Sequence, residues 1–410
     1  MSIYELACRA FQGAARLGRK LWPWREPVLL RGPGCVSQLP SLIKSLGLRR
    51  VLLVTDPGLM RLGLPRPLVS ALEKAGIFCV VYDQTAANPG PRDIEEARRL
   101  CIGAKCQCVI GFGGGSTMDC AKMACLLSAY PSKKASRMKG VQPVRLRRVP
   151  TLIAVPTTAG SGSEATVAAV VTNPESQVKY SVISPRLRPK YAVLDPALTL
   201  GLPPRFTAQT GMDALTHAVE AYLSRGRTKD TDARAREAVR LIFDNLEAAH
   251  AGSRDSAARD AMLYASYCAG LAFTKAYVGY AHGIAHALGG LYDIPHGLAC
   301  AVTLPHVLEA YGPRAHARLA ALCDDAGLAG PGQSDAEKTE VFIHTLRLMN
   351  TSMGIPAKLK CITEEDVPKL AARVLKESNP LYPVPRIWRQ EECEGVVRGM
   401  GKGGGVLDDN

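Results

Sequence analysis

The sequence lacks an apolar run that could cross a bilayer as a helix, which takes about 20 residues, so we expect no membrane span. Its beginning lacks the charged-then-apolar order of a secretory leader, and we therefore expect a cytoplasmic protein. The thirteen cysteines include no Cys-x-x-Cys pair, so we expect reduced thiols that fill core space. Cys101, Cys106 and Cys108 lie close together in the sequence, and a metal site there is the less favoured alternative.

Acidic residues are absent from the stretch 133–148, which carries seven of the chain's 51 lysines and arginines. This stretch also lacks aromatic residues for stacking against bases and matches no nucleic-acid-binding motif, so we expect no nucleic-acid partner. We favour a solvated basic loop, whose field could steer acidic substrates or anionic partners.

The chain of 410 residues divides into three segments by its patterns. Residues 1–27 contain an amphipathic helix and form an N-terminal helical extension. In residues 28–202, short apolar runs alternate with helix-like stretches, which predicts an α/β domain with a parallel sheet. Residues 203–410 show helical patterns and no convincing strand, which predicts an all-α C-terminal domain. The expected strands are 51–54, 78–82, 109–111, 152–155 and 191–194, and the main expected C-terminal helices are 207–223, 230–249, 255–273, 296–311 and 335–349.

Four glycines within five positions mark the junction between a predicted strand and a predicted helix. They include Gly113, Gly114 and Gly115, and Ser116 follows them. Glycines let the backbone approach a pyrophosphate, and a helix N-terminus offers free N–H groups to it. Ser116 and Asp119 have the spacing of a capping box, which supports a helix start there. We therefore favour phosphate binding over a plain tight turn.

The usual dinucleotide fingerprint is absent, because the glycines do not follow the first strand. The acid that could hold the adenosine ribose comes earlier, at Asp56, after the first clear strand. A carboxylate there would accept bonds from a 2′-hydroxyl and repel a 2′-phosphate, which favours NAD(H), although Asp56 could equally be a helix N-cap before Pro57. The polar loop 156–164, with Thr157 and Thr158, suits another wall of the same crevice.

Five potential metal ligands gather at three predicted helix positions. Asp213 and His217 are four residues apart, as are His282 and His286, and each pair therefore shares one helix face. His296 begins the next predicted helix. A carboxylate with imidazoles is a borderline-soft set that suits Fe(II) or Zn(II). This spacing predicts a metal site, which makes the second domain the metal-binding one and the first the dinucleotide-binding one.

A divalent cation lowers the pKa of a bound alcohol and polarises an aldehyde carbonyl in the reverse direction. Together with a nicotinamide, such a centre could exchange hydride with a carbon that carries oxygen. These features predict an NAD(H)-dependent alcohol dehydrogenase that acts on a small primary or secondary alcohol and the matching aldehyde or ketone.

Four motifs together resemble the iron-containing, or group III, alcohol dehydrogenase family. They are Gly113-Gly114-Gly115-Ser116-x-x-Asp119-x-x-Lys122, the segment 156–161, the segment 211–218, and the histidines from His282 to His296. The resemblance covers nearly the whole chain. It implies an α/β domain followed by a helical domain, a homodimer, and Fe(II) as the metal, with Zn(II) as the alternative.

The resemblance also implies individual roles. Asp213, His217, His282 and His296 would bind the metal, and His286 would lie near it and relay protons. Residues 113–116 would hold the pyrophosphate and Asp56 the adenosine ribose. Further contacts toward the nicotinamide half would come from Thr157, Thr166 and Lys179.

The sequence departs from better-known family members at Ala168 and over residues 273–277, near the expected substrate. If the segment from Lys275 to His282 is one helix, Lys275 lies about two turns from the metal and could bind a substrate carboxylate. The alternative, which we favour slightly, is that Lys275 faces solvent. Rival functions are a glycerol dehydrogenase-like or dehydroquinate synthase-like enzyme on the same scaffold, or a non-catalytic binding or scaffold protein.

Overall fold

The computed structural model describes residues 2–19, 24–142, 148–173, 178–252 and 255–401. Its contacts divide the chain into two compact units. The α/β unit comprises residues 23–202 and 254–274, and the helical unit comprises residues 1–22, 203–253 and 275–410. Because the chain passes between the units more than once, each unit contains segments that are distant in the sequence.

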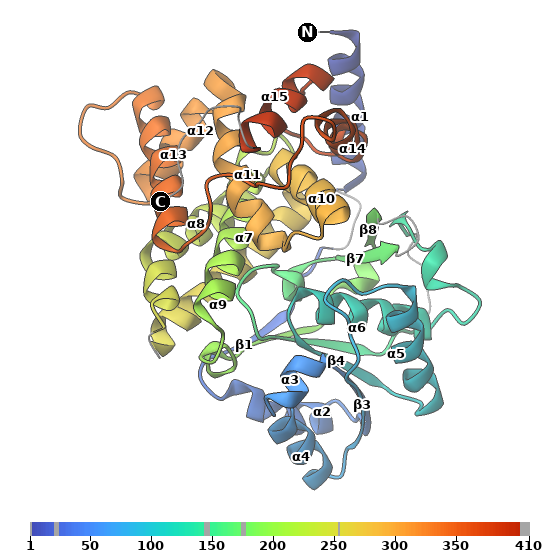
Figure 1. Cartoon of the computed structure of the whole chain (residues 1–410). Helices are drawn as coiled ribbons and strands as arrows, with labels where there is room; N and C mark the ends of the chain where they lie inside the picture. Colours follow the sequence, from blue (N-terminus) through green and yellow to red (C-terminus); the bar gives the residue numbers. More distant parts are fainter. Residues whose placement is uncertain (1, 20–23, 143–147, 174–177, 253–254, 402–410) are drawn as a thin grey trace. The chain divides into compact units, whose positions relative to one another are not determined.

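A six-stranded sheet is the centre of the α/β unit (Figure 1). Its order is β1-β9-β6-β4-β2-β3, and every neighbouring pair is parallel, as the alternating sequence pattern predicts. The strands are β1 (Val28–Arg31), β2 (Arg50–Val54), β3 (Phe78–Tyr82), β4 (Cys108–Gly113), β6 (Thr151–Pro156) and β9 (Tyr191–Leu194). The helices of this unit are α2 (Leu39–Ser45), α3 (Pro57–Arg61), α4 (Arg66–Lys74), α5 (Pro91–Gly103), α6 (Gly115–Ser128) and most of α9 (Ser256–Ala276).

Helices cover both faces of this sheet, because its strands are apolar on both sides. Leu52 and Val54 of β2 pack with the buried residues of α5 and α6. The alternate residues Val51 and Leu53 pack with α2 and α4 on the opposite face. Successive side chains of a strand point to opposite faces, so a continuous apolar run serves two cores.

A second, three-stranded sheet was not predicted from the sequence. It has the order β5-β8-β7, with β5 (Gly140–Val141), β7 (Ala168–Asn173) and β8 (Val178–Ile183). Strands β7 and β8 pair antiparallel, with Thr172 opposite Lys179. Strand β5 lies inside the basic stretch 133–148, whose residues 143–147 fall outside the described part of the chain.

Most of helix α9 belongs to the α/β unit, although the sequence places it in the all-helical segment 203–410. Its buried residues Leu263, Tyr267 and Leu271 share a core cluster with β9. The contact is close because two glycines meet there: a Cβ atom added to Gly270 would lie 2.5 Å from the carbonyl oxygen of Gly162. The sequence pattern alone did not reveal this tertiary contact.

The helical unit consists of nine α-helices in the part of the chain that is described, and no strand was found there. Its helices are α1 (Ile3–Arg19), α7 (Pro204–Leu223), α8 (Lys229–His250), α10 (Tyr280–Tyr292), α11 (His296–Tyr311), α12 (His316–Asp325), α13 (Asp335–Ser352), α14 (Val367–Ser378) and α15 (Gln390–Met400). None of the helices in the described ranges is long and apolar enough to cross a membrane.

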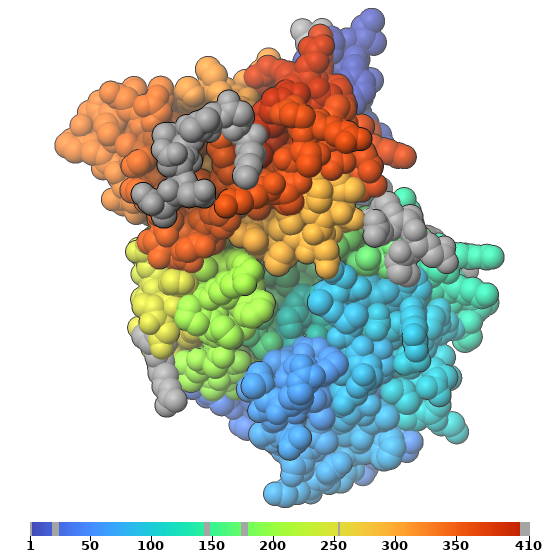
Figure 2. Space-filling model, in the orientation of Figure 1, coloured from blue at the N-terminus to red at the C-terminus, as the bar shows by residue number. Residues whose placement is uncertain are grey.

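The N-terminal helix α1, in blue, lies on the surface of the helical unit beside the orange-red C-terminal part of the chain (Figure 2). Arg9 donates hydrogen bonds to the carbonyl oxygens of Val384 and Pro385, and Gln12 donates to those of Pro380 and Tyr382. The sequence extension is thus attached to the helical unit by polar contacts to backbone. Several of its apolar residues are exposed, namely Ile3, Leu6, Phe11 and Leu17.

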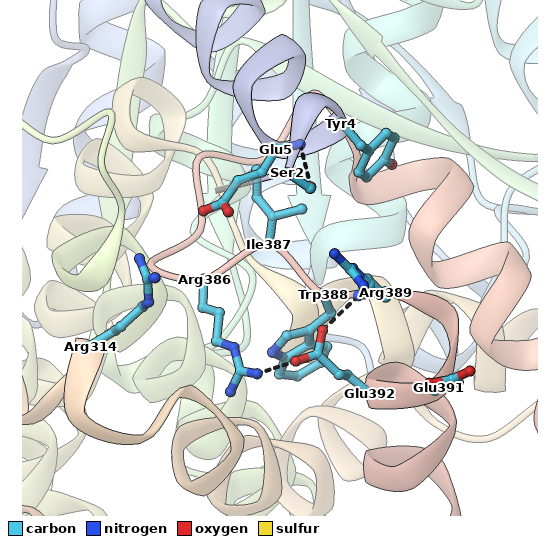
Figure 3. Close-up of a pocket in the computed structure, with 10 residues that line it drawn as sticks. All are labelled: Ser2, Tyr4, Glu5, Arg314, Arg386, Ile387, Trp388, Arg389, Glu391 and Glu392. Atoms are coloured by element: carbon cyan, nitrogen blue, oxygen red, sulfur yellow. Dashed lines mark hydrogen bonds and ion pairs between the residues drawn. The ribbon is translucent and has the colours of Figure 1, made fainter.

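A polar pocket of about 440 Å³ lies between the start of α1 and the residues that precede and begin α15 (Figure 3). Three arginines and three glutamates line it, so its formal charges balance. Arg386 forms an ion pair with Glu392, whose carboxylate also accepts a hydrogen bond from the backbone N–H of Arg389. None of the residues expected to bind metal or cofactor lines this pocket.

The contact between Gly162 and Gly270 leads to a testable expectation. Gly270→Ala should destabilise the protein by about 2–4 kcal/mol, because the added methyl group has no space in this close-packed contact. Gly103→Ala is the control: the added Cβ meets no atom within 4 Å, so this change should leave stability equal or slightly higher. Equal urea midpoints for the two variants would contradict the packing described here.

Candidate metal centre and nucleotide loop

Helix α7 carries the first two expected ligands on a buried face. Asp213 and His217 are 5% and 6% exposed, and they lie one helical turn apart as the sequence predicts. Helix α11 approaches α7 closely at Gly297, where a Cβ atom would clash with the backbone carbonyl of Gln209. Because Gly297 follows His296, this approach brings His296 to the same place as Asp213.

Helix α10 carries His282 and starts abruptly. Tyr277 has a left-handed φ of 65° and Gly279 is the N-cap, so α9 and α10 are separate helices. The buried carboxylate of Glu220 on α7 accepts hydrogen bonds from the backbone N–H groups of Gly279 and Ala281, both at 2.7 Å. It also lies 2.6 Å from Nδ1 of His282. One carboxylate therefore fixes both the start of the helix and the imidazole on it.

The break between α9 and α10 removes the premise on which Lys275 was placed near the metal. The segment from Lys275 to His282 is not one helix, so the condition for placing Lys275 two turns from His282 is not met. Lys275 Nζ instead forms an ion pair with Asp230 at the start of α8, with 2.7 Å between Nζ and Oδ2. This contact favours the alternative in which Lys275 is not a substrate ligand.

The Asp213 carboxylate lies among three imidazoles. Its Oδ1 is 3.7 Å from His217 Nδ1, 3.6 Å from His282 Nε2 and 3.5 Å from His296 Nε2. These separations are too long for hydrogen bonds, and among the described residues neither Asp213 Oδ1 nor His282 Nε2 has a hydrogen-bond partner. Donor atoms that share one tetrahedral ion at about 2.1 Å are about 3.4 Å apart. The spacing therefore fits a divalent cation at the centre of the cluster.

The charges of the cluster also suit a cation. Burial raises the pKa of Asp213, but the three imidazoles lower it overall, so the carboxylate is ionised. Burial and the neighbouring His282 keep the pKa of His217 well below its usual value, so this imidazole is neutral. An ionised carboxylate and a neutral imidazole are the forms that bind a metal.

The group of donor atoms that all lie within 4.8 Å of one another differs by one residue from the expected ligand set. It comprises Asp213, His282, His296 and Cys300, whereas His217 is not part of it. The ring of His217 nevertheless lies 4.1 Å from that of His282, centroid to centroid. In the described ranges, Cys101, Cys106 and Cys108 do not form such a group, so the cysteine alternative finds no support.

His286 lies beside this cluster and has its own carboxylate partner. Its ring stacks on that of His296 with 5.2 Å between centroids. Its Nδ1 is 2.6 Å from Oε1 of Glu377, which also accepts a hydrogen bond of 2.7 Å from the Tyr382 hydroxyl. Burial raises the pKa of Glu377, but His286 and Tyr382 lower it overall. A proton on His286 thus has a charged acceptor network behind it.

The glycine loop lies at the carboxyl end of β4, at the start of α6. Strands β3 and β4 lie on opposite sides of β2 in the sheet. The connection after β2 therefore leads toward one edge of the sheet and the connection after β4 toward the other, so a topological switch point lies between β2 and β4. Ligands of open α/β sheets bind at such a switch point. Gly113 has φ 157°, and a Cβ atom there would lie 2.7 Å from Thr117 Oγ1. A Cβ atom on Gly115 would lie 2.9 Å from Ser161. Side chains are therefore excluded from the loop.

The expected capping box at Ser116 and Asp119 is wrong. Helix α6 begins at Gly115 with Gly114 as N-cap, and Gly114 offers no side chain to cap the helix. Ser116 Oγ instead donates to the backbone carbonyl of Ala87, and Asp119 accepts bonds from Ser163 Oγ and the N–H of Val170. No side chain caps the start of α6 in the described structure, and a phosphate site requires such uncapped N–H groups.

Asp119 and Thr166 belong to a buried hydrogen-bond network beside the polar loop 156–164. Lys122 Nζ donates to Ser163 Oγ, Thr166 Oγ1 and the carbonyl of Ala168 at 2.7–2.8 Å. Burial lowers the pKa of Lys122 to about 8. These bonds connect α6 to the loop and to β7.

The other expected cofactor contacts lie at two places. The Thr157 N–H donates to the Gly113 carbonyl, and a Cβ atom on Gly114 would lie 3.6 Å from Thr158 Oγ1. Both threonines therefore border the glycine loop. Lys179 lies on β8 and is half-buried.

Asp56 combines the two interpretations that the sequence left open. It is the N-cap of α3, where Oδ1 accepts the N–H of Leu59 at 3.0 Å. Its Oδ2 lies 3.5 Å from Thr117 Oγ1, in the first turn after the glycine loop. One oxygen is thus used by the helix, and the other is directed toward the switch point.

Sequence reasoning missed Glu220, Glu377, Tyr382 and Cys300. Two of them carried a local signal: Glu220 is three residues after His217, and Cys300 is four residues after His296, so each shares a helix face with an expected ligand. Glu377 and Tyr382 had no such signal, because they reach the site only through the packing of α14.

Comparison with known proteins agrees with this geometry. The model of the iron-containing alcohol dehydrogenase family matches residues 27–196, and that of the C-terminal part of the Fe-containing alcohol dehydrogenase family matches residues 207–399. The chain is 38% identical over 371 residues to 1,3-propanediol dehydrogenase of Citrobacter freundii, which covers 90% of this chain and 95% of that protein. It is 37% identical over 376 residues to alcohol dehydrogenase 4 of Saccharomyces cerevisiae, with 91% and 96% covered.

Solved structures give the same result. A crystal structure of 1,3-propanediol oxidoreductase matches with a TM-score of 0.87 and 36% identity, over 92% of this chain and 99% of that one. The predicted fold class, an α/β domain with a parallel sheet and a helical domain that holds the candidate metal site, is confirmed. The protein is an oxidoreductase of alcohols and aldehydes, and its chain belongs to the iron-containing alcohol dehydrogenase family.

Proposed function

We propose that the enzyme interconverts a small primary or secondary alcohol and its aldehyde or ketone with NAD(H) and a divalent metal, Fe(II) or Zn(II). The observation that carries this proposal is the buried Asp213 carboxylate among three imidazoles, whose Oδ1 has no hydrogen-bond partner in the described ranges. We assign Asp213, His217, His282 and His296 as ligands. A cation held there would lower the pKa of the substrate hydroxyl and polarise the carbonyl in the reverse direction.

The protein's own groups would orient the reactants and move the proton. The N–H groups at the start of α6 would hold the pyrophosphate, and Oδ2 of Asp56, which lies 3.5 Å from Thr117 Oγ1, would accept bonds from the adenosine ribose. His286 would take the proton of the alcohol, and the Glu377 carboxylate at Nδ1 would stabilise the resulting imidazolium. Thr157, Thr166 and Lys179 would bind toward the nicotinamide half, and Thr158 would form part of the wall beside the glycine loop.

The direct test measures NADH absorbance with a panel of short alcohols and aldehydes, with and without added Fe(II) or Zn(II). Turnover that depends on metal and cofactor supports the proposal. A metal-loaded protein that turns over none of the panel would overturn it. We also propose that the enzyme is cytoplasmic and forms a homodimer; its thirteen cysteines, all free thiols, agree with a reducing compartment.

Metal retention should separate the ligands from the proton relay. His282→Ala and His296→Ala should each lose the metal and turnover, because each removes a donor from the cluster. His286→Ala should keep the metal and slow the proton-linked step by about 10²–10⁴-fold. Elemental analysis of purified variants checks this, with His344→Ala on the exposed face of α13 as the control. Equal metal loss in the three site variants would contradict these roles.

Cofactor preference should depend on the charge of Asp56. The wild-type enzyme should have a higher initial rate with NADH than with NADPH. Asp56→Gly should reduce the ratio of these two rates about tenfold or more, because a charge-assisted hydrogen bond is worth about 1.5–3 kcal/mol. Asp56→Asn keeps a good N-cap and removes the charge, so it separates the two roles of this residue. Initial rates measured with NADH and with NADPH test this prediction. A wild-type preference for NADPH would refute the assignment of Asp56 as the acid that binds the adenosine ribose.

Glu220 should act as a positioning residue for His282. Glu220→Gln removes one acceptor from a carboxylate that receives two backbone N–H groups and lies at His282 Nδ1. Loss of such a partner weakens metal binding about 10–100-fold. Competition with a chelator measures this, with the exposed Glu340→Gln as control. Unchanged metal affinity in Glu220→Gln, with an unchanged circular dichroism spectrum, would show that the contact is only structural.

A further inference from the structure

Cys300 is the one member of the buried donor group that the proposed ligand set does not use. It lies on α11, one turn after His296, and is fully buried. Its Sγ is 3.7 Å from His296 Nε2. Its Sγ and one donor atom each of Asp213, His282 and His296 all lie within 4.8 Å of one another. The thiol thus faces the same point as the carboxylate and the two imidazoles.

The surroundings of the thiol indicate a ligand rather than a core filler. Asp213 is 5% exposed, and among the described residues its Oδ1 has no hydrogen-bond partner, so an ionised oxygen faces the same space as the sulfur. His282 is 2% exposed, and its Nδ1 is occupied by Glu220, so its Nε2 is the atom that faces this space. A cation in this space would compensate the charge of the carboxylate. The Cys300 sulfur, which lies within 4.8 Å of the other donor atoms, is placed to bind the same cation.

We propose that Cys300 is a sulfur donor of the metal centre and that it makes the site prefer Zn(II) to Fe(II). This inference rests on the proposed metal-dependent function and chooses between its two metals. Thiolates are soft ligands, and zinc accepts sulfur together with imidazole and carboxylate. On binding, the Cys300 thiol gives its proton to solvent and its sulfur forms a bond to the metal.

Substitution of cobalt(II) gives a test that does not depend on activity. Cobalt loaded into the wild-type protein should show visible ligand-field bands and, in addition, the near-ultraviolet charge-transfer band of a cobalt–thiolate bond. Cys300→Ser and Cys300→Ala should keep the ligand-field bands and lose the charge-transfer band. Cys323→Ser, which removes a buried thiol of α12 outside the donor group, should keep both.

The metal preference provides a second measurement. After incubation of the metal-free protein with equal Zn(II) and Fe(II) under reducing, oxygen-free conditions, the bound Zn:Fe ratio should fall about tenfold or more in Cys300→Ser. A wild-type cobalt spectrum with ligand-field bands and no charge-transfer band would overturn the role of Cys300 and leave the proposed function intact. A wild-type protein that binds none of these metals would overturn both.

Discussion

The helical unit depends on one electrostatic constraint, the ionised Asp213 carboxylate in its interior. An isolated buried charge is costly unless it is paired or coordinates a cation. Burial lowers the pKa of His282, but Cys300, Asp213 and Glu220 raise it overall. An imidazole must nevertheless be neutral at the nitrogen that binds a metal, so the imidazoles of an occupied site would not neutralise Asp213. A divalent cation would resolve this constraint, and α7, α10 and α11 each contribute at least one side chain to the candidate site.

Two further carboxylates orient imidazoles in this unit, and their surroundings differ. The side chain of Glu220 is 2% exposed, and each of its two carboxylate oxygens accepts a hydrogen bond from a backbone N–H group. It therefore holds the His282 imidazole in a fixed orientation. The side chain of Glu377 is 32% exposed, and its partners are the His286 imidazole and the Tyr382 hydroxyl. The first arrangement suits a metal ligand with a fixed tautomer, and the second suits a residue whose protonation changes during turnover.

The sequence predicted the parts of the structure that depend on local spacing. Asp213 with His217, and His282 with His286, are four residues apart, and helical periodicity alone places each pair on one face. Five of the six parallel strands were predicted from apolar runs because both faces of the sheet are buried, whereas the edge strand β1, whose end residues are exposed, was not predicted. The contacts of Glu377 and the place of α9 depend on tertiary packing, which periodicity does not encode. The possibility that Lys275 binds substrate, which the sequence left as the less favoured alternative, required one continuous helix to His282, and Tyr277 interrupts the chain there with a left-handed φ that the sequence does not announce.

Asp56 shows why two interpretations of one residue need not compete. A carboxylate has two oxygens, and an N-cap uses only one of them. Capping fixes the side-chain torsions of Asp56, so the second oxygen has a defined direction before any ligand arrives. Binding of a ribose hydroxyl then costs less conformational entropy than it would with a mobile acid. The helix cap would therefore preorganise the proposed cofactor contact, and the glycines at the end of β4 would leave the space beside it open for the proposed pyrophosphate.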